Sequence, residues 1–428
     1  MIYANIPALR GQLHKVEEYA ALAAEYGYGE EVKKEAAKLE AAIEAAIAAV
    51  RKLADENETA GEPSCYDAIR KLCPGGNTPV KNFDNLRDRM AGAVLGRFAG
   101  CTLGAPVEMW AIDDMAAAAK FGGMDFPPTD YWTVVARPWD KRYGVDEVVK
   151  YSKDGIDGVP VDDDVTYTIL GLLIIERYGF DFTVEDVGEI WKEILPYACT
   201  AEDIALKNLQ KGIPAKDAGI IDNPFVQWIG ADIRADGFGY AAAGNPELAA
   251  KMGYVDAYLS HRRNGIYGEM FFAAAIAAAF TTSDPIEPIR VALKEIPSTC
   301  TLYADIVWAL EVGPQLKDYR EARKAVDQRF EGMSSVHTNN NACLTIFGLF
   351  LGKGDFTDTI ANVIAMGLDN DCTGATVGSI IGAVVGEKGI AAHWTKPFNN
   401  KVRTYLIGHE EMAIDNVIDR FVKLVKMQ

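Results

Sequence analysis

Two runs of regularly spaced glycines place the strongest constraint on how this chain can fold. The first run steps by four residues through Gly92, Gly96, Gly100 and Gly104. The second run, far along the chain, has the same spacing at Gly374, Gly378, Gly382 and Gly386. A spacing of four puts each run on one face of a helix. Each interior glycine costs about 1 kcal/mol relative to alanine, so we expect both faces to lie close to another backbone.

Carboxylates stand at or near the ends of these two predicted helices and at the start of a third. Glu108 follows the first glycine run by four residues, and Asp369 and Asp371 precede the second run. Three more carboxylates stand before the apolar stretch 167–175, at Asp162, Asp163 and Asp164. One aspartate at a helix start needs no role beyond that of an N-cap. The number of acids, however, raises the question of whether they converge.

Converging carboxylates would need a counter-charge. Two of them about 4 Å apart repel by roughly 4 kcal/mol at an effective dielectric constant near 20. Oxygen-rich clusters suit the hard divalent ions Mg²⁺, Mn²⁺ and Ca²⁺ rather than zinc. A pair of such ions can orient a substrate and activate water. Convergence is an expectation, because spacing along the chain does not show it.

The rest of the chain predicts an all-α protein. From residue 83 onward, helical patterns alternate with loops, and no convincing run of period-two strands occurs. Residues 121–157 are rich in Gly, Pro, Trp and Asp, which predicts a long loop beside a site. Thr183 and Asp186 form a capping-box-like start of an amphipathic helix.

Residues 1–82 predict a helical hairpin and connector, separate from a catalytic domain at 83–428. Apolar residues alternate steps of four and three at Val32, Ala36, Leu39, Ile43, Ala46, Val50 and Leu53. Gly27 and Gly29 would separate this helix from a weaker helical stripe before it. Two interpretations remain open: an arm for homodimerisation or docking, and a hairpin packed on its own catalytic domain.

Composition excludes several classes of partner. The chain has 428 residues, of which 49% are hydrophobic, and a net charge of −18. This charge argues against nonspecific nucleic-acid binding and against anionic membranes. We expect no signal peptide, and the longest apolar runs, such as 270–280, are too short to span a membrane. Seven scattered cysteines without a CxxC pair are typical of reduced thiols, which predicts a cytoplasmic protein.

Three segments together resemble the signatures of the ADP-ribosylglycohydrolase family, which includes the dinitrogenase-reductase-activating glycohydrolase and the J1 crystallins. They are DRMAGAVLGRFAGCTLGAPVE, DDDVTYTILGL and GLDNDCTGATVGSIIGA, in the family's order, and the resemblance covers about residues 84–390. It implies a compact orthogonal all-α domain with two Mg²⁺ or Mn²⁺ ions. It also implies hydrolysis of the glycosidic bond to ADP-ribose in a cleft above the metals.

The resemblance assigns roles to individual acids. Glu108 matches the acid that ends the first motif and is a candidate base or gate, with Asp163 or Asp369 as alternative bases. The implied metal ligands are Asp162, Asp163, Asp164, Asp369, Asp371 and Cys372. The chain departs from the family pattern at four positions, because other residues usually stand where it has Cys101, Asp162, Val165 and Cys372. A thiol is a poorer ligand than oxygen for a hard ion.

Two further segments resemble the substrate side of the family cleft. Residues 233–240 contain Arg234 and Gly237, and residues 261–267 begin with His261. Arg234 or His261 would contact a phosphate or order the cleft, although His261 is also readily explained as a buried structural histidine. The role of His337 is similarly undecided.

Several functions are compatible with these residues. The first is a metal-dependent hydrolase that removes ADP-ribose from a protein, a nucleic acid or a small molecule. The second is a noncatalytic ADP-ribose-binding or crystallin-like structural protein. The third is a hydrolase of another N- or O-glycoside in the same cleft. Retention of the matching acids favours the first.

Overall fold

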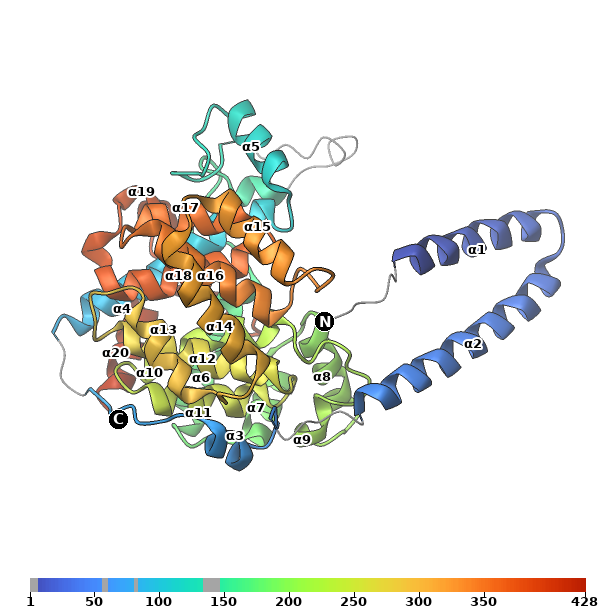
Figure 1. The fold of residues 1–428 in the computed structure, drawn as a ribbon, viewed down its shortest axis with the longest axis horizontal. Coiled ribbons are helices and arrows are strands. Elements are labelled where there is room, and N and C mark those ends of the chain that lie inside the picture. The colour runs from blue at the N-terminus through green and yellow to red at the C-terminus, as the bar shows by residue number, and fades with distance from the viewer. Residues whose placement is uncertain (1–6, 56–60, 81–83, 134–146) are drawn as a thin grey trace. The chain divides into compact units, whose positions relative to one another are not determined.

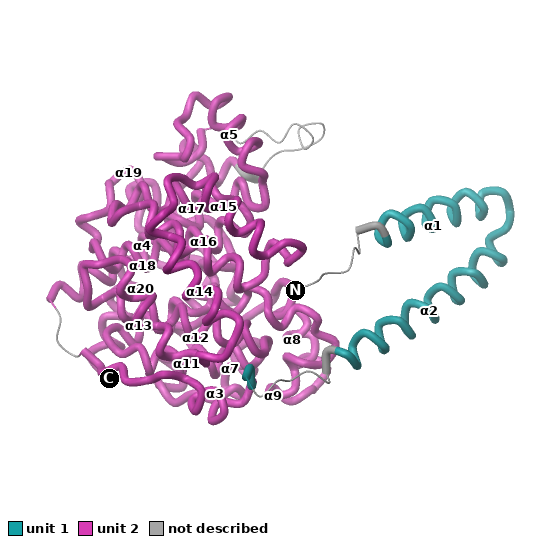
Figure 2. The backbone as a smooth tube through the Cα atoms, in the orientation of Figure 1, with its two compact units in different colours: residues 1–63 teal, residues 64–428 magenta. Residues whose placement is uncertain are grey.

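The computed structural model describes residues 7–55, 61–80, 84–133 and 147–428. Contacts divide the chain into two compact units, Met1–Pro63 and Ser64–Gln428 (Figure 2). The domain boundary expected after residue 82 falls on residues 81–83, outside the described part of the chain. Residues 64–80 belong to the larger unit, where Arg70 pairs with Glu295 at 2.6 Å.

The smaller unit is the predicted helical hairpin, formed by α1 (Pro7–Glu25) and α2 (Gly29–Asp55). The two helices meet near their connecting turn, where four apolar side chains are half-buried: Ala20, Ala23, Val32 and Leu39. Away from the turn the two helices diverge (Figure 1). None of the described side chains of these two helices is fully buried.

The larger unit is built almost entirely from helices, which confirms the predicted all-α class (Figure 1). Its α-helices are α3 (Tyr66–Leu72), α4 (Leu86–Gly104), α5 (Ile112–Phe121), α6 (Asp163–Tyr178), α7 (Val184–Ile194), α8 (Thr200–Gln210), α9 (Ala215–Ala218), α10 (Ala235–Ala241), α11 (Pro246–Ala257), α12 (Asn264–Ala279), α13 (Glu287–Ala292), α14 (Thr301–Val312), α15 (Tyr319–Arg329), α16 (Thr338–Gly352), α17 (Phe356–Met366), α18 (Asn370–Val385), α19 (Ala392–Thr395) and α20 (Ile414–Val425). Its 3₁₀ turns are η1 (Ala105–Val107), η3 (Glu147–Tyr151), η4 (Ile229–Arg234), η5 (Leu293–Glu295), η6 (Gly313–Gln315), η7 (Glu387–Gly389) and η8 (Lys396–Phe398).

One small sheet was not predicted. Strands β1 (Lys401–Arg403) and β2 (Glu411–Ala413) pair antiparallel, with Val402 opposite Met412. Strands of three residues are too short to show a period of two, so the sequence pattern could not identify them. Between α5 and α6 the described residues are irregular apart from η3, as expected for a loop, and residues 134–146 lie outside the described part.

The glycine runs of α4 and α18 meet each other. A Cβ atom added at Gly92, Gly96 or Gly100 would lie under 3.0 Å from the carbonyl oxygen of Gly382, Gly378 or Gly374, respectively. The helices are antiparallel, since the partner number falls as the first number rises. The predicted close approach of a second backbone is therefore confirmed, and each run is the other's partner.

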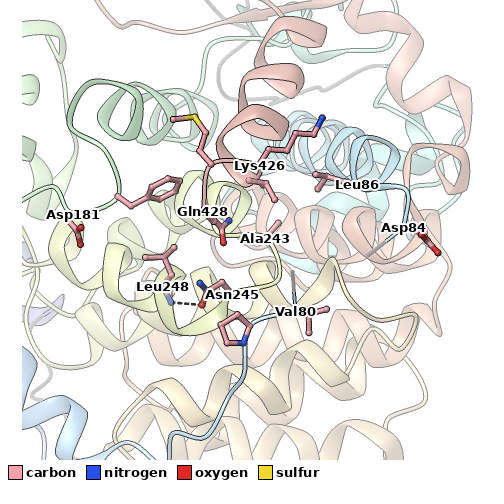
Figure 3. Close-up of a pocket in the computed structure, with 13 residues that line it drawn as sticks. Val80, Asp84, Leu86, Asp181, Ala243, Asn245, Leu248, Lys426 and Gln428 are labelled. Atoms are coloured by element: carbon pink, nitrogen blue, oxygen red, sulfur yellow. Dashed lines mark hydrogen bonds between the residues drawn. The ribbon is translucent and has the colours of Figure 1, made fainter. Parts of the chain in front are cut away.

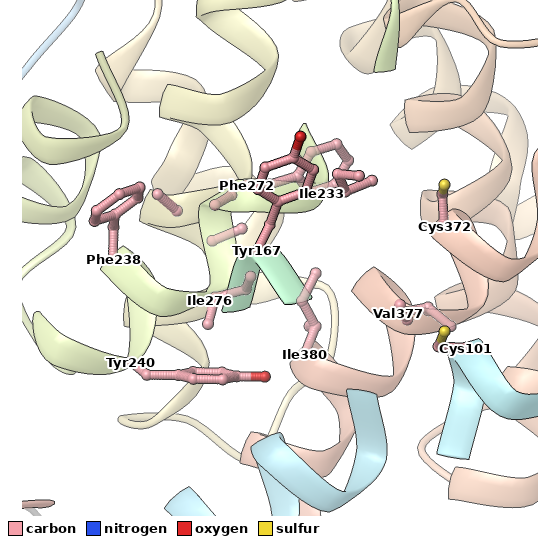
Figure 4. Close-up of a cluster of buried hydrophobic side chains, with 14 of the residues drawn as sticks. Cys101, Tyr167, Ile233, Phe238, Tyr240, Phe272, Ile276, Cys372, Val377 and Ile380 are labelled. Atoms are coloured by element: carbon pink, nitrogen blue, oxygen red, sulfur yellow. The ribbon is translucent and has the colours of Figure 1, made fainter. Parts of the chain in front are cut away.

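The core surrounds α12, whose residues are all buried and which contacts α10, α11, α13 and α18. A helix that is apolar all round belongs in a protein interior. Figure 4 shows part of this core, where Tyr167, Phe272 and Ile276 gather near the start of α6. Among the described residues, the segment Leu86–Val107 is long and apolar enough to cross a membrane, longer than the runs noted in the sequence. It is 94% buried inside the protein, as a core helix is.

Candidate active site

Acids from three separate elements converge at one end of the α4–α18 pair. Donor atoms lie within 4.8 Å of one another in each of three clusters, which are Cys101–Asp162–Asp164, Asp164–Asp371–Cys372 and Glu108–Asp369–Asp371. Asp164 belongs to the first two clusters and Asp371 to the last two. The three clusters therefore form one continuous acidic centre rather than three separate ones.

The glycine faces bring two of these elements together. A Cβ atom at Gly104 would collide with the backbone of Asp371, so the end of α4 lies directly against the first turn of α18. The chain then passes through η1 to Glu108, and the backbone N–H of the next residue, Met109, donates to the carbonyl of Leu368 at 3.0 Å. Residues on both sides of this contact, Glu108 and Asp369, are thereby held next to each other.

The third element, α6, enters the centre through its N-terminus. Asp162 is the N-cap, and its Oδ1 accepts a hydrogen bond from the backbone N–H of Asp164 at 3.0 Å. Capping by aspartate accounts for one carboxylate oxygen of Asp162. The helix begins at Asp163, so Asp164 lies in its first turn and faces the α4–α18 pair.

A buried arginine forms a hydrogen-bonded ion pair with one acid of the centre. Arg97 on α4 donates from Nη2 to Asp164 Oδ1 at 2.9 Å and from Nη1 to Asp236 Oδ2 at 2.6 Å. All three side chains are fully buried. Burial opposes the guanidinium charge, but the two carboxylates keep its pKa above the ordinary arginine value. Arg97 therefore fixes the position of Asp164 and supplies part of its counter-charge.

The charges of the clustered acids are only partly compensated within the protein. Burial, assisted by neighbouring carboxylates, raises the pKa of Asp371 to about 7. Burial also raises the pKa of Asp164 to about 7, although Arg97 opposes the shift. The pKa values of Asp162 and Asp369 lie well above the ordinary aspartate value, because of burial first and neighbouring carboxylates second.

Two buried carboxylate oxygens of the centre have no hydrogen-bond partner in the described structure, Asp164 Oδ2 and Asp371 Oδ1. Buried polar atoms without a hydrogen-bond partner are rare in folded proteins and destabilise them. Both atoms belong to residues shared between two clusters. An oxygen-rich centre with unpartnered anionic oxygens fits divalent cations, and the residues that could hold them are Glu108, Asp162, Asp164, Asp369 and Asp371, with the thiols of Cys101 and Cys372.

The centre opens into a cavity of about 520 Å³. Its floor contains acids of all three elements, and its walls are rich in aromatic and small polar residues. The lining residues are Glu108, Val161, Asp162, Asp163, Tyr167, Tyr197, Cys199, Thr200, Glu202, Trp228, Ile229, Gly230, Ile233, Val336, Asp369, Asp371, Cys372 and Tyr405. A polar molecule with a planar aromatic part matches such a lining.

A second cavity, of about 830 Å³, lies beside the C-terminal residues of the chain (Figure 3). Val80, Asn245, Leu248 and Gln428 are among its lining residues. It contains none of the clustered acids, and the pKa of its Asp181 is lowered by the hydrogen bond with Lys251, as for a paired surface carboxylate. Chemistry rather than size therefore identifies the smaller, acid-floored cavity as the candidate active site.

Comparison with known proteins agrees with this geometry. Residues 82–426 match the sequence profile described as ADP-ribosylglycohydrolase. The chain belongs to the ADP-ribosylglycohydrolase family. A solved structure titled "ADP-ribosylglycohydrolase-related protein complex" is similar at 17% sequence identity, with a TM-score of 0.46, covering 81% of this chain and 99% of that one. No curated protein matches.

Among the acids predicted from the family motifs, Asp163 occupies a different place from its neighbours. It lines the cavity but belongs to none of the three clusters. Its side chain is half-buried, and burial raises its pKa. Glu108 is exposed at the cavity while its carboxylate remains within reach of Asp369 and Asp371.

The residues predicted on the substrate side lie outside the cavity lining. Arg234 is only 2% exposed, and its guanidinium binds three buried carboxylates, those of Glu202, Asp256 and Glu269. Gly237 permits close packing of α10 on α6, since a Cβ atom there would lie 3.1 Å from the carbonyl oxygen of Thr168. Both residues therefore pack behind the residues that line the cavity and do not line it themselves.

Of the two candidate histidines, His261 is buried and His337 is half-buried. His261 Nδ1 lies 2.8 Å from Ser260 Oγ, and burial together with two nearby arginines lowers its pKa well below the ordinary value. His337 caps α16 by accepting from the backbone N–H of Asn339 at 3.1 Å, and burial lowers its pKa to about 4. Neither imidazole lines the cavity.

Sequence reasoning missed Arg97 and the aromatic walls. Arg97 interrupts an apolar face between two glycines of the first run, and this isolated charge was a usable signal. Tyr197, Trp228 and Tyr405 come from three separate segments, and no local spacing connects them. The rings of Tyr197 and Tyr405 meet edge to face, 5.9 Å apart, so the fold rather than a motif assembles this wall.

Proposed function

We propose that this protein is a metal-dependent hydrolase that cleaves the glycosidic bond of an ADP-ribosylated substrate and releases ADP-ribose. One observation carries the proposal: three acidic clusters are linked through Asp164 and Asp371, and their members Glu108, Asp162, Asp369 and Asp371 line an open cavity. Shared carboxylates are the arrangement expected for two adjacent divalent ions, Mg²⁺ or Mn²⁺. Family membership supports a glycohydrolase acting on ADP-ribosyl groups.

Bound ions would polarise a substrate oxygen and lower the pKa of water. The chain would contribute the remaining functions. Asp162, Asp164, Asp369 and Asp371 would hold the ions, and Arg97 would keep Asp164 oriented. The carboxylates on the cavity floor would favour an oxocarbenium-like transition state, in which positive charge develops on the sugar ring.

Glu108 is the candidate general base. It is exposed at the cavity, unlike the buried aspartates, so it can reach a water molecule and exchange its proton with solvent. The aromatic side chains of Tyr197, Trp228 and Tyr405 would bind the nucleotide part of the substrate, since every nucleobase has a face suited to stacking. The acceptor to which ADP-ribose is attached would leave through the cavity opening.

The test is release of free ADP-ribose. Wild-type protein with Mg²⁺ or Mn²⁺ is incubated with arginine-linked, serine-linked and nucleic-acid-linked ADP-ribose, and products are separated by HPLC. We expect release from at least one linkage. Glu108→Gln keeps the shape of the side chain and removes its charge, so it should retain ADP-ribose binding while turnover falls by about 10²–10⁴-fold.

A matched control places the same change on an acid outside the cavity. Glu410→Gln alters an exposed glutamate whose Oε1 accepts from the backbone N–H of Gly408, and it should leave turnover unchanged. Binding of ADP-ribose without release from any linkage would instead identify a binding protein. Equal turnover by wild type and Glu108→Gln would exclude Glu108 as the base.

A further inference from the structure

Two buried thiols lie among the carboxylates of the acidic centre. Cys101 Sγ is grouped with Asp162 and Asp164, and Cys372 Sγ is grouped with Asp164 and Asp371. The two cysteines are 1% and 6% exposed, and Figure 4 shows them on the adjacent ends of α4 and α18. Two of the three clusters therefore offer one sulfur and two carboxylate groups each.

An independent observation indicates that a ligand belongs at these clusters. Asp164 Oδ2 and Asp371 Oδ1 are buried and have no hydrogen-bond partner in the described structure. Asp164 participates in both sulfur-containing clusters, and Asp371 in one of them. The residues that carry the unpartnered oxygens thus belong to the same clusters as the thiols.

The identity of the donors determines which ion fits. Mg²⁺ prefers oxygen ligands in near-octahedral geometry and retains several waters. Thiolate ligands favour ions further along the order from Mn²⁺ through Fe²⁺ and Co²⁺ to Zn²⁺. Two sulfurs among so few donors therefore shift selectivity away from Mg²⁺.

We propose that Cys101 and Cys372 are metal ligands, and that the centre binds borderline divalent ions in preference to Mg²⁺. Each sulfur would lose its proton to solvent as its bond to the ion forms. This inference rests on the proposed function in assuming an ion at this centre. The inference therefore predicts Mn²⁺ rather than Mg²⁺ at this centre, and it predicts that Fe²⁺, Co²⁺ and Zn²⁺ bind more tightly than Mn²⁺.

The test uses Co²⁺ as a spectroscopic probe with the full-length protein. Metal-free protein is titrated with Co²⁺, and thiolate ligation is detected as a sulfur-to-cobalt charge-transfer absorption in the near ultraviolet. We expect this absorption, and we expect it to survive about a hundredfold excess of Mg²⁺ over Co²⁺. Cys372→Ser should weaken the band and raise the Co²⁺ dissociation constant by at least about tenfold.

Controls separate this centre from the other thiols. Cys199→Ser changes a cysteine that lines the same cavity but belongs to no cluster, and Cys65→Ser changes an exposed one. Both variants should keep the full band. Should Cys372→Ser fail to fold, Cys101→Ser and the wild-type spectrum still test the proposal.

The outcomes distinguish this inference from the proposed function. Co²⁺ binding detected by a thermal shift but without a charge-transfer band would overturn the thiolate ligands and leave an oxygen-only metal centre. Easy displacement of Co²⁺ by Mg²⁺ would also overturn the stated selectivity. Failure of every ion to bind would remove the metal centre itself, and with it the proposed metal-dependent function.

A separate observation concerns the hairpin of residues 7–55. Its described side chains include no buried hydrophobic residue, although many large apolar ones are present. Those exposed away from the turn are Leu9, Leu13, Val16, Ile43, Ile47, Val50 and Leu53. Contiguous exposed apolar surface of this kind is typical of protein–protein contacts, so we expect this surface to have a partner.

The charges of the hairpin are divided along its length. The end that contains the turn, residues 17–35, carries six glutamates and two lysines. The open end, residues 7–16 and 43–55, carries two acids, Glu44 and Asp55, and four cations, Arg10, Lys15, Arg51 and Lys52. Two hairpins that lie head to tail would therefore place the acidic turn of each beside the basic open end of the other.

We propose that the partner of this surface is the hairpin of a second copy of the chain. A two-fold axis would make the contact self-complementary in both charge and apolar surface. The two helices diverge away from their connecting turn (Figure 1), and the apolar side chains at the open end are exposed. The product would be an antiparallel four-helix bundle with the seam of α2 inside.

Sedimentation equilibrium of the full chain tests this dimer. We expect a dimer whose dissociation constant rises at least about tenfold in Val50→Glu, a loss of about 1.4 kcal/mol. Ala48→Glu places the same charge outside the seam of α2 and should leave the dimer intact. Lys52→Glu should weaken association. Adding Glu31→Lys in the same chain should restore it, because the exchanged charges at the open end of each copy would then face those at the turn of the other copy.

A chain that stays monomeric at all concentrations would overturn this proposal, whether its hairpin packs on its own catalytic unit or binds another protein. A dimer that tolerates Val50→Glu would also overturn it, since its interface would then lie elsewhere.

Discussion

Asp164 links the scaffold to the acidic centre. One of its carboxylate oxygens accepts from Arg97, and the other has no partner in the described structure. The side chain is therefore oriented by the fold on one side and available to a ligand on the other. Replacing Arg97 would remove both the orientation and a buried counter-charge, which is why a residue outside the cavity matters to the site.

The perturbed aspartates predict how pH affects the metal-free protein. The folded-state pKa values of Asp164 and Asp371 are about 7, above the ordinary aspartate value of about 3.9. Stability from keeping these groups neutral is therefore fully present only below about pH 4, and it is lost as the pH rises through about 7. Without metal, we expect the melting temperature to fall between about pH 4 and about pH 7.

Thermal denaturation after EDTA treatment measures this trend. Asp371→Asn should flatten it, because an amide keeps the shape of the side chain without titrating. Adding Mn²⁺ should raise the melting temperature most at the upper end of the range, where the carboxylates are free to bind it. A metal-free protein whose melting temperature rises steadily over the same range would contradict the raised pKa values.

At the scale of the elements, the α4–α18 pair predicts a steric limit. Leucine at Gly96 or Gly378 would place a side chain where the facing backbone already lies. We expect each substitution to destabilise the protein by about 1–3 kcal/mol or more, as measured by denaturant unfolding. Gly11→Leu provides the control, since a Cβ atom at Gly11 meets nothing within 4 Å. Near-wild-type stability of both core variants would exclude the close packing.

Much of this element-level structure could be predicted from local pattern. The glycine spacing indicated two faces that need a close neighbour, and the Thr183–Asp186 capping box begins α7 as expected. The identity of the neighbour could not be predicted, because a spacing of four describes the shape of a face and not its partner. The start of α16 is likewise not evident from local pattern, since the helix includes the run Asn339–Asn341, which has low helix propensity, and its cap is His337.

At the scale of the whole molecule, the acids that cluster could be identified from the sequence, but their convergence could not. Charge repulsion and donor chemistry indicated a metal centre if the acids met, and the structure brings together Glu108, Asp162, Asp164, Asp369 and Asp371. The cavity walls depend on loops that lie far apart in the chain. Arg234 is an example of what the sequence could not show. Its position in a motif predicted a substrate contact, but its side chain is buried behind the cavity wall.

The interlocked glycines also govern which changes of length the molecule can accept. Sliding α4 past α18 by one repeat of four residues, about 6 Å along the helix, would again bring glycine opposite glycine. The same slip would move Glu108 away from Asp369 and Asp371. The spacing of the glycine runs alone therefore does not determine which glycines face each other. The contacts of Gly104 with Asp371 and of Gly386 with Asp88 at the two ends remove this ambiguity. Insertions or deletions of four residues within either helix should therefore destabilise the protein, even though they preserve the glycine spacing.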